Sequence, residues 1–158
     1  MIIKGIIFED FVNYKKPCMT IEFPHCDFKC DKECGMNVCQ NSPLIHIDNI
    51  DITIEYIVNA YINNDITEAL CFQGLEPFDD FDDMCRLIAS VRTNGCYDDI
   101  VIYTGYYENE ISDKIEKLIP FKNIIIKFGR YIPNDTPVYD DILGVTLSSH
   151  NQYAKKIS

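Results

Sequence analysis

The chain has 158 residues, of which 47% are hydrophobic, and its formal net charge is −11 at pH 7. This length is enough for one domain with a hydrophobic core, and an acidic chain lacks the excess of Lys and Arg that nucleic-acid binding needs. No apolar run approaches the ~20 residues that span a bilayer, and the first residues carry no signal-peptide pattern. We therefore expect a cytoplasmic protein with no nucleic-acid or membrane partner.

The hydrophobic pattern alternates between strand and helix periods along the chain. Short β-rich runs predict strands at residues 2–8, 19–23, 69–72, 100–103, 123–127 and 144–147. Apolar side chains at helical spacing predict helices after Thr53, after Asp79 or Asp80, and over residues 111–119, and a short helix is expected near Gln152. Strands that alternate with helices predict an α/β fold with a parallel sheet.

Four cysteines crowd into a polar segment after the strand at 19–23. They are Cys26, Cys30, Cys34 and Cys39. Thiolates on one loop are soft ligands for zinc or for an iron–sulfur cluster, and the cytosol disfavours disulfides. From this loop alone, a cluster and a zinc knuckle that uses all four cysteines are both open. The cysteines at 18, 71, 85 and 96 are scattered, so we expect them not to be ligands.

Two other predicted strands end in small and polar residues. One is followed by Gln-Gly-Leu-Glu-Pro at 73–77, and the next by Thr-Gly-Tyr at 104–106. In parallel α/β sheets, functional residues gather at the C-terminal ends of the strands. We therefore expect these two segments and the cysteine loop to share one pocket. Arg130 is a candidate for a ligand's carboxylate, although a surface ion pair is the simpler expectation.

The cysteine loop resembles the C-x3-C-x2-C signature of radical S-adenosylmethionine (SAM) enzymes, in which three thiolates hold a [4Fe-4S] cluster and one iron is left for SAM. That spacing would place the third ligand at Glu33, so Cys34 or Cys39 must take its place. We favour Cys39, because it is followed by one residue and Asn41, as in many glycyl-radical activating enzymes. The segment 73–77 is similar to the Gly-Gly-Glu-Pro segment of the same family, and this second similarity favours the cluster over zinc.

Three further segments resemble the anaerobic ribonucleotide-reductase activating proteins, which are small radical SAM enzymes. They are Asp-Phe-Val-Asn at 10–13, Tyr-Thr-Gly-Tyr at 103–106 and Ser-Ser-His-Asn-Gln at 148–152. The resemblance implies a single radical SAM domain over residues 1–158, folded as a partial, open (β/α)6-type barrel. The chain departs from the usual members after Asn13, where they have Gly-Pro-Gly, and before Gly129, where they have Asp.

The resemblance also implies a site and a reaction. Cys26, Cys30 and Cys39 would hold the cluster. The residues implied to position SAM are Gln73, Gly74, Glu76, Thr104 and Gly105. An electron from a flavodoxin- or ferredoxin-type donor would cleave SAM to a 5′-deoxyadenosyl radical, which would take a hydrogen atom from a glycine of an anaerobic ribonucleotide reductase or similar glycyl radical protein. Two alternatives are a radical SAM enzyme with another protein or small-molecule substrate, and a non-enzymatic zinc-binding interaction module.

Overall fold

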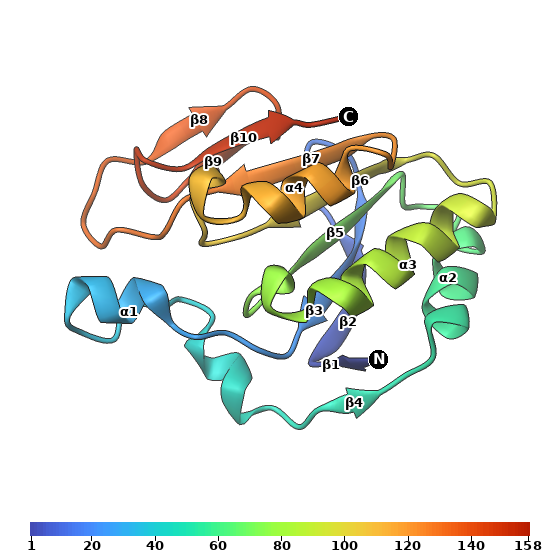
Figure 1. Ribbon diagram of the computed structural model, residues 1–158, viewed down its shortest axis with the longest axis horizontal. Helices are drawn as coiled ribbons and strands as arrows, with labels where there is room; N and C mark the ends of the chain where they lie inside the picture. The colour runs from blue at the N-terminus through green and yellow to red at the C-terminus, as the bar shows by residue number, and fades with distance from the viewer.

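The computed structural model describes residues 1–158 and centres on a six-stranded sheet (Figure 1). In spatial order the sheet contains β10 (Tyr153–Lys156), β7 (Ile124–Phe128), β6 (Asp99–Tyr103), β5 (Ala69–Gly74), β3 (Cys18–Phe23) and β2 (Gly5–Asp10). The four central strands are parallel to one another. The two edge strands, β2 and β10, are antiparallel to their neighbours.

Three helices connect the parallel strands. Helix α2 (Ile54–Ile62) precedes β5, α3 (Phe81–Thr93) joins β5 to β6, and α4 (Ser112–Leu118) joins β6 to β7. The Thr53 side chain caps α2 as predicted, because its hydroxyl accepts a hydrogen bond from the backbone N–H of Tyr56. Asp80 stands at the N-cap position of α3 without a capping hydrogen bond from its side chain.

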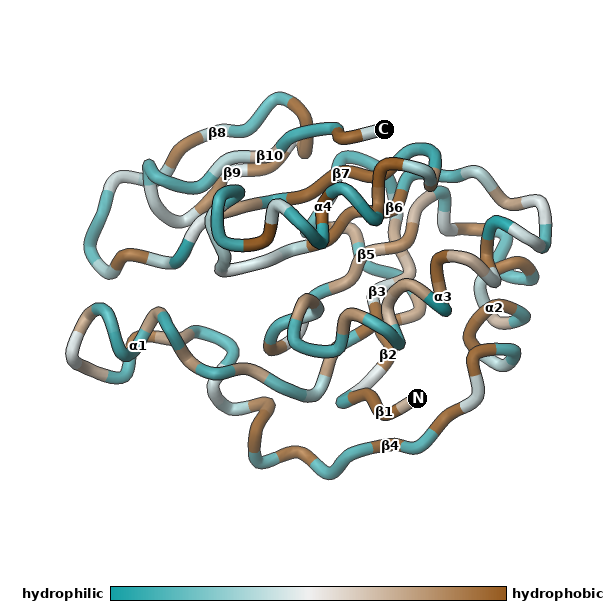
Figure 2. The backbone as a smooth tube through the Cα atoms, in the orientation of Figure 1, coloured by the Kyte–Doolittle hydropathy of each residue, from teal (hydrophilic) through white to brown (hydrophobic).

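Both faces of the central sheet are buried. The face toward the helices carries Ile21, Phe72, Ile102 and Ile126, which belong to the core that includes the apolar side chains of α2, α3 and α4. The opposite face carries Cys18, Cys71, Val101 and Ile125, which belong to a second, smaller core. Burial on both faces explains why these strands read as continuous apolar runs (Figure 2). Cys71 is therefore a packing residue, as the sequence predicts, and the structure shows the same of Cys18.

The second core is covered by the turn that follows β2 and by a hairpin of β8 (Val138–Asp140) and β9 (Val145–Leu147). The predicted strand at 144–147 thus lies in this hairpin and outside the main sheet. The short helix expected near Gln152 is wrong, because the residues after it form β10 and pair with β7. The fully buried β7 would otherwise end the sheet with an unpaired backbone edge, and β10 satisfies that edge.

The remaining elements are short. They are β1 (Ile2–Ile3), α1 (Lys29–Cys34), β4 (Ile50–Asp51) and the 3-10 helices η1 (Ser42–His46), η2 (Pro77–Asp80) and η3 (Glu108–Glu110). None of the helices is long and apolar enough to cross a membrane. The α/β class and the cysteine-rich loop after an early strand are confirmed. The sheet has four parallel strands and antiparallel edges, so the (β/α)6-type barrel stays a prediction.

Candidate functional site

A pocket of about 290 Å³ lies at the C-terminal ends of the parallel strands. Its walls come from the cysteine loop, the ends of β5, β6 and β7, the turn after β2 and the segment 145–148. All five residues that the resemblance assigns to SAM line it, namely Gln73, Gly74, Glu76, Thr104 and Gly105. The structure thus brings together the three segments that the sequence places at the strand ends.

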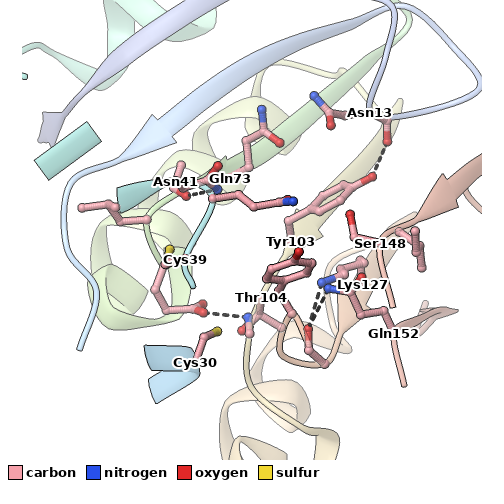
Figure 3. Close-up of a pocket in the computed structure, with 18 of the residues that line it drawn as sticks. Asn13, Cys30, Cys39, Asn41, Gln73, Tyr103, Thr104, Lys127, Ser148 and Gln152 are labelled. Atoms are coloured by element: carbon pink, nitrogen blue, oxygen red, sulfur yellow. Dashed lines mark hydrogen bonds between the residues drawn. The ribbon is translucent and has the colours of Figure 1, made fainter. Parts of the chain in front are cut away.

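Three of the four loop cysteines line this pocket. They are Cys26, Cys30 and Cys39, whereas Cys34 is not among the lining residues. Figure 3 shows Cys30 and Cys39 on one side of the pocket and Lys127, Ser148 and Gln152 on the other. Phe28 adopts a left-handed conformation with φ of 54°, and its backbone N–H donates to Cys26 Sγ at 3.3 Å.

Burial in the pocket raises the pKa of each of the three lining thiols. Burial raises the pKa of Cys26 to about 12, and the Glu76 carboxylate and the Cys39 thiolate act in the same direction. Burial also raises the pKa of Cys30, where Cys39 again adds to the effect. A bound metal centre would reverse these shifts, because it holds thiols as thiolates.

The donor set can be compared with the two kinds of metal centre. A zinc ion needs its ligands around one centre, whereas a cluster binds each cysteine through a different iron. Cys26, Cys30 and Cys39 line the same pocket, and three thiols are the soft ligands that a [4Fe-4S] cluster with one open iron takes, so the donor chemistry fits a cluster.

Glu76 ties two strand ends together. Its side chain is buried, Oε1 accepts from the Phe78 backbone N–H at 3.1 Å, and Oε2 accepts from the Gly105 backbone N–H at 2.9 Å. Burial raises the pKa of Glu76 to about 7 against the opposing effect of these bonds. Both carboxylate oxygens are engaged within the protein, so Glu76 fixes the ends of β5 and β6 relative to each other.

Gly74 joins the end of β5 to two neighbouring segments. The Asn41 side-chain amide donates to its carbonyl oxygen at 2.7 Å, which links the cysteine loop to the strand end (Figure 3). Gly74 has φ of +96°, and an added Cβ would lie 2.7 Å from the backbone nitrogen of Phe23. No side chain fits between these two strands, which explains the glycine at this position.

Replacing Gly74 with alanine is expected to destabilise the fold more than Gly95→Ala. Gly95 also has a positive φ, of +81°, but an added Cβ would meet nothing within 4 Å. The control should cost about 1–2 kcal/mol for the left-handed backbone. Gly74→Ala should cost at least about 1 kcal/mol more, because the backbone of Phe23 must move. Denaturant unfolding measures both, and equal costs would contradict the close approach.

Lys127 is a pocket residue that the sequence reasoning missed. It is the one charged residue of β7, it is 6% exposed, and its Nζ donates to the Gly129 carbonyl oxygen at 2.9 Å. Burial lowers the pKa of Lys127 to about 8, whereas Glu76 and Cys30 oppose that shift. Burying a single charge within an apolar strand is costly. A lone lysine in the run Ile-Ile-Ile-Lys-Phe could therefore have identified Lys127 as a pocket residue from the sequence.

Arg130 is committed to ion pairs. Its two terminal nitrogens donate to the Glu110 carboxylate at 2.8 and 2.7 Å, and its Nε lies 3.2 Å from a Glu33 oxygen. The structure therefore has the expected ion pair, but the Arg130 side chain is buried and does not lie on the surface as expected. Gln152 lines the pocket, and its side-chain amide donates to the backbone oxygen of Gly129. The Asn151 side-chain amide donates to the backbone oxygen of Arg130.

Fold and site define an α/β protein in which a cysteine loop and the parallel strand ends enclose one pocket. The family model described as a 4Fe-4S single cluster domain matches residues 18–152. Because this match covers most of the chain, the protein belongs to the 4Fe-4S single cluster domain family, and the family indicates a [4Fe-4S] cluster. Comparison with curated proteins finds no match, and comparison with solved structures finds none either.

Proposed function

We propose that this protein is a radical SAM enzyme that generates a glycyl radical on an anaerobic ribonucleotide reductase or a similar glycyl radical protein. The observation that carries the proposal is that three cysteines, rather than four, line the pocket at the strand ends. Three thiolates leave one iron of a [4Fe-4S] cluster open to a ligand, whereas an electron carrier binds its cluster with four.

Cys26, Cys30 and Cys39 are the proposed cluster ligands. Cys30 and Cys34 both belong to α1, but only Cys30 lines the pocket, which supports the exclusion of Cys34. With SAM bound, the reduced cluster supplies the electron that cleaves SAM to methionine and a 5′-deoxyadenosyl radical. A flavodoxin- or ferredoxin-type protein is the proposed source of that electron.

The pocket offers partners of both signs for the amino-acid end of SAM. The proposed acceptors for its ammonium group are backbone oxygens at the end of β5, namely that of Gln73 and the second lone pair of the Gly74 oxygen, which also accepts from Asn41. Lys127 places a buried cation in the same pocket, which suits the carboxylate. Thr104 and Gly105 form the neighbouring wall, which Glu76 holds in register with β5.

Exposed apolar residues at the mouth of the pocket support the proposal that the substrate is a protein. Val12 lines the pocket although the residue is 75% exposed, so it marks where the pocket meets solvent. Its neighbour Phe11 is 63% exposed. Exposed apolar side chains beside a site favour contact with a protein surface. A glycine-bearing loop of the partner would enter here.

The proposal is tested by following SAM and the partner together. The reconstituted protein is reduced anaerobically with SAM and a candidate anaerobic ribonucleotide reductase, and 5′-deoxyadenosine and the glycyl radical are measured by chromatography and EPR. We expect both products, and neither with Cys26→Ala. 5′-Deoxyadenosine without a radical on the reductase would contradict the substrate and favour another target. Absence of both would contradict the radical SAM assignment.

A further inference from the structure

The segment between Cys30 and Cys39 is longer than the spacing of the radical SAM signature. It begins within α1, which runs from Lys29 to Cys34 and has no buried residue. Figure 1 shows α1 standing clear of the central sheet. Apolar packing therefore does not fix this segment, and its position must depend on polar contacts.

Asp31 closes this segment into a loop. Its Oδ1 accepts hydrogen bonds from the backbone N–H groups of Val38 and Cys39, both at 2.8 Å. Gly35, with φ of +66°, ends α1 and turns the chain back toward Asp31. Hydrogen bonds from backbone N–H groups to a carboxylate are stronger than neutral ones, so one side chain holds Cys39 near Cys30.

Glu33 and Lys29 fasten the same loop to the body of the protein. Glu33 stands where the signature would have its third cysteine, and its carboxylate lies 3.2 Å from Nε of Arg130. The Arg130 side chain is 3% exposed and is also held by Glu110. Lys29 Nζ lies 3.7 Å from the Glu110 carboxylate and 4.2 Å from the centre of the Tyr106 ring.

We propose that Asp31 is the positioning residue that brings Cys39 into the place of the third cluster ligand. In the usual signature the shorter spacing places the third cysteine beside the second, and here the closed loop brings Cys39 there instead. The Glu33–Arg130 pair anchors the loop to the segment that follows β7. This inference rests on the proposed ligand set of Cys26, Cys30 and Cys39. Without the Asp31 carboxylate, Val38 and Cys39 lose their common acceptor, and Cys39 leaves the pocket first.

The test compares Asp31→Ala, Asp31→Asn and Asp48→Ala in the reconstituted full chain. Asp48 is an exposed carboxylate in the same connecting segment and serves as the matched control. An iron chelator and a thiol-alkylating reagent are added, iron release is followed by absorbance, and the alkylated cysteines are identified by mass spectrometry.

We expect Asp31→Ala to release iron roughly tenfold faster or more, the factor that corresponds to losing hydrogen bonds to a charged acceptor. Cys39 should be alkylated ahead of Cys26 and Cys30. Asp31→Asn keeps an acceptor oxygen and should retain most of the native protection, and Asp48→Ala should match the native chain.

Two results would overturn the inference. One is an Asp31→Ala variant that behaves like Asp48→Ala. The other is alkylation of Cys26, Cys30 and Cys39 at similar rates in Asp31→Ala, because general destabilisation would expose all three. A Cys39→Ala variant measured beside them distinguishes a wrong ligand set from a wrong positioning role for Asp31. If it keeps its iron, the proposed ligand set fails; if only Asp31→Ala keeps it, the positioning role alone fails.

Discussion

Replacing Cys39 with alanine is expected to prevent assembly of the [4Fe-4S] cluster, whereas Cys34→Ala is expected to leave the cluster in place. Cys39 lines the pocket with Cys26 and Cys30, and Cys34 does not. After anaerobic reconstitution, Cys34→Ala should bind about four iron atoms per chain, and Cys39→Ala should bind only a small fraction of that number. Iron and sulfide analysis measures the difference directly.

The two cysteine variants are matched in chemistry and lie in the same loop, so each is the control for the other. The opposite pattern would transfer the third ligand position to Cys34. Loss of the metal centre in both variants would indicate a site that needs all four cysteines, as a zinc knuckle does.

Replacing Lys127 with methionine is expected to weaken SAM binding strongly. The substitution removes the buried cation of the pocket while keeping a flexible side chain of similar length. Losing one partner of a buried charge pair costs about 2 kcal/mol or more, which is roughly thirty-fold in Kd. Equilibrium binding of SAM to the reconstituted variant measures this loss, and the iron content shows that the cluster is intact.

Two further variants make the Lys127 result specific. Lys127→Arg keeps the charge and should retain more of the affinity than the methionine variant. Lys122→Met changes an exposed lysine and should bind SAM as the native chain does. Native affinity in Lys127→Met would remove Lys127 from the proposed carboxylate contact.

The parts of the fold that local sequence determines were predictable. The runs at 100–102 in β6 and 124–126 in β7 are continuously apolar because both faces of these strands are buried. The strand β10 was not predictable in this way. Its alternation is short, and its structure depends on the free backbone edge of β7, which no local pattern near Gln152 reveals.

The site likewise has parts that the sequence predicts and parts that depend on the folded chain. The cysteine loop and the segments at 73–77 and 104–106 were expected at one edge, because parallel strands end together. The bonds of Glu76 to Gly105 and of Asp31 to Cys39 join residues that only the folded loops bring together. The left-handed turn at Phe28 is likewise set by its surroundings, since bulky residues seldom adopt that conformation.

The most direct test of the central claim is EPR spectroscopy of the anaerobically reconstituted, dithionite-reduced protein with and without SAM. We expect the signal of a reduced [4Fe-4S] cluster and a change in that signal when SAM is added, because one iron is open to the ligand. A cluster signal that SAM leaves unchanged would contradict SAM binding at the cluster. A colourless protein that binds a single zinc ion and no cluster would contradict the assignment as a radical SAM enzyme.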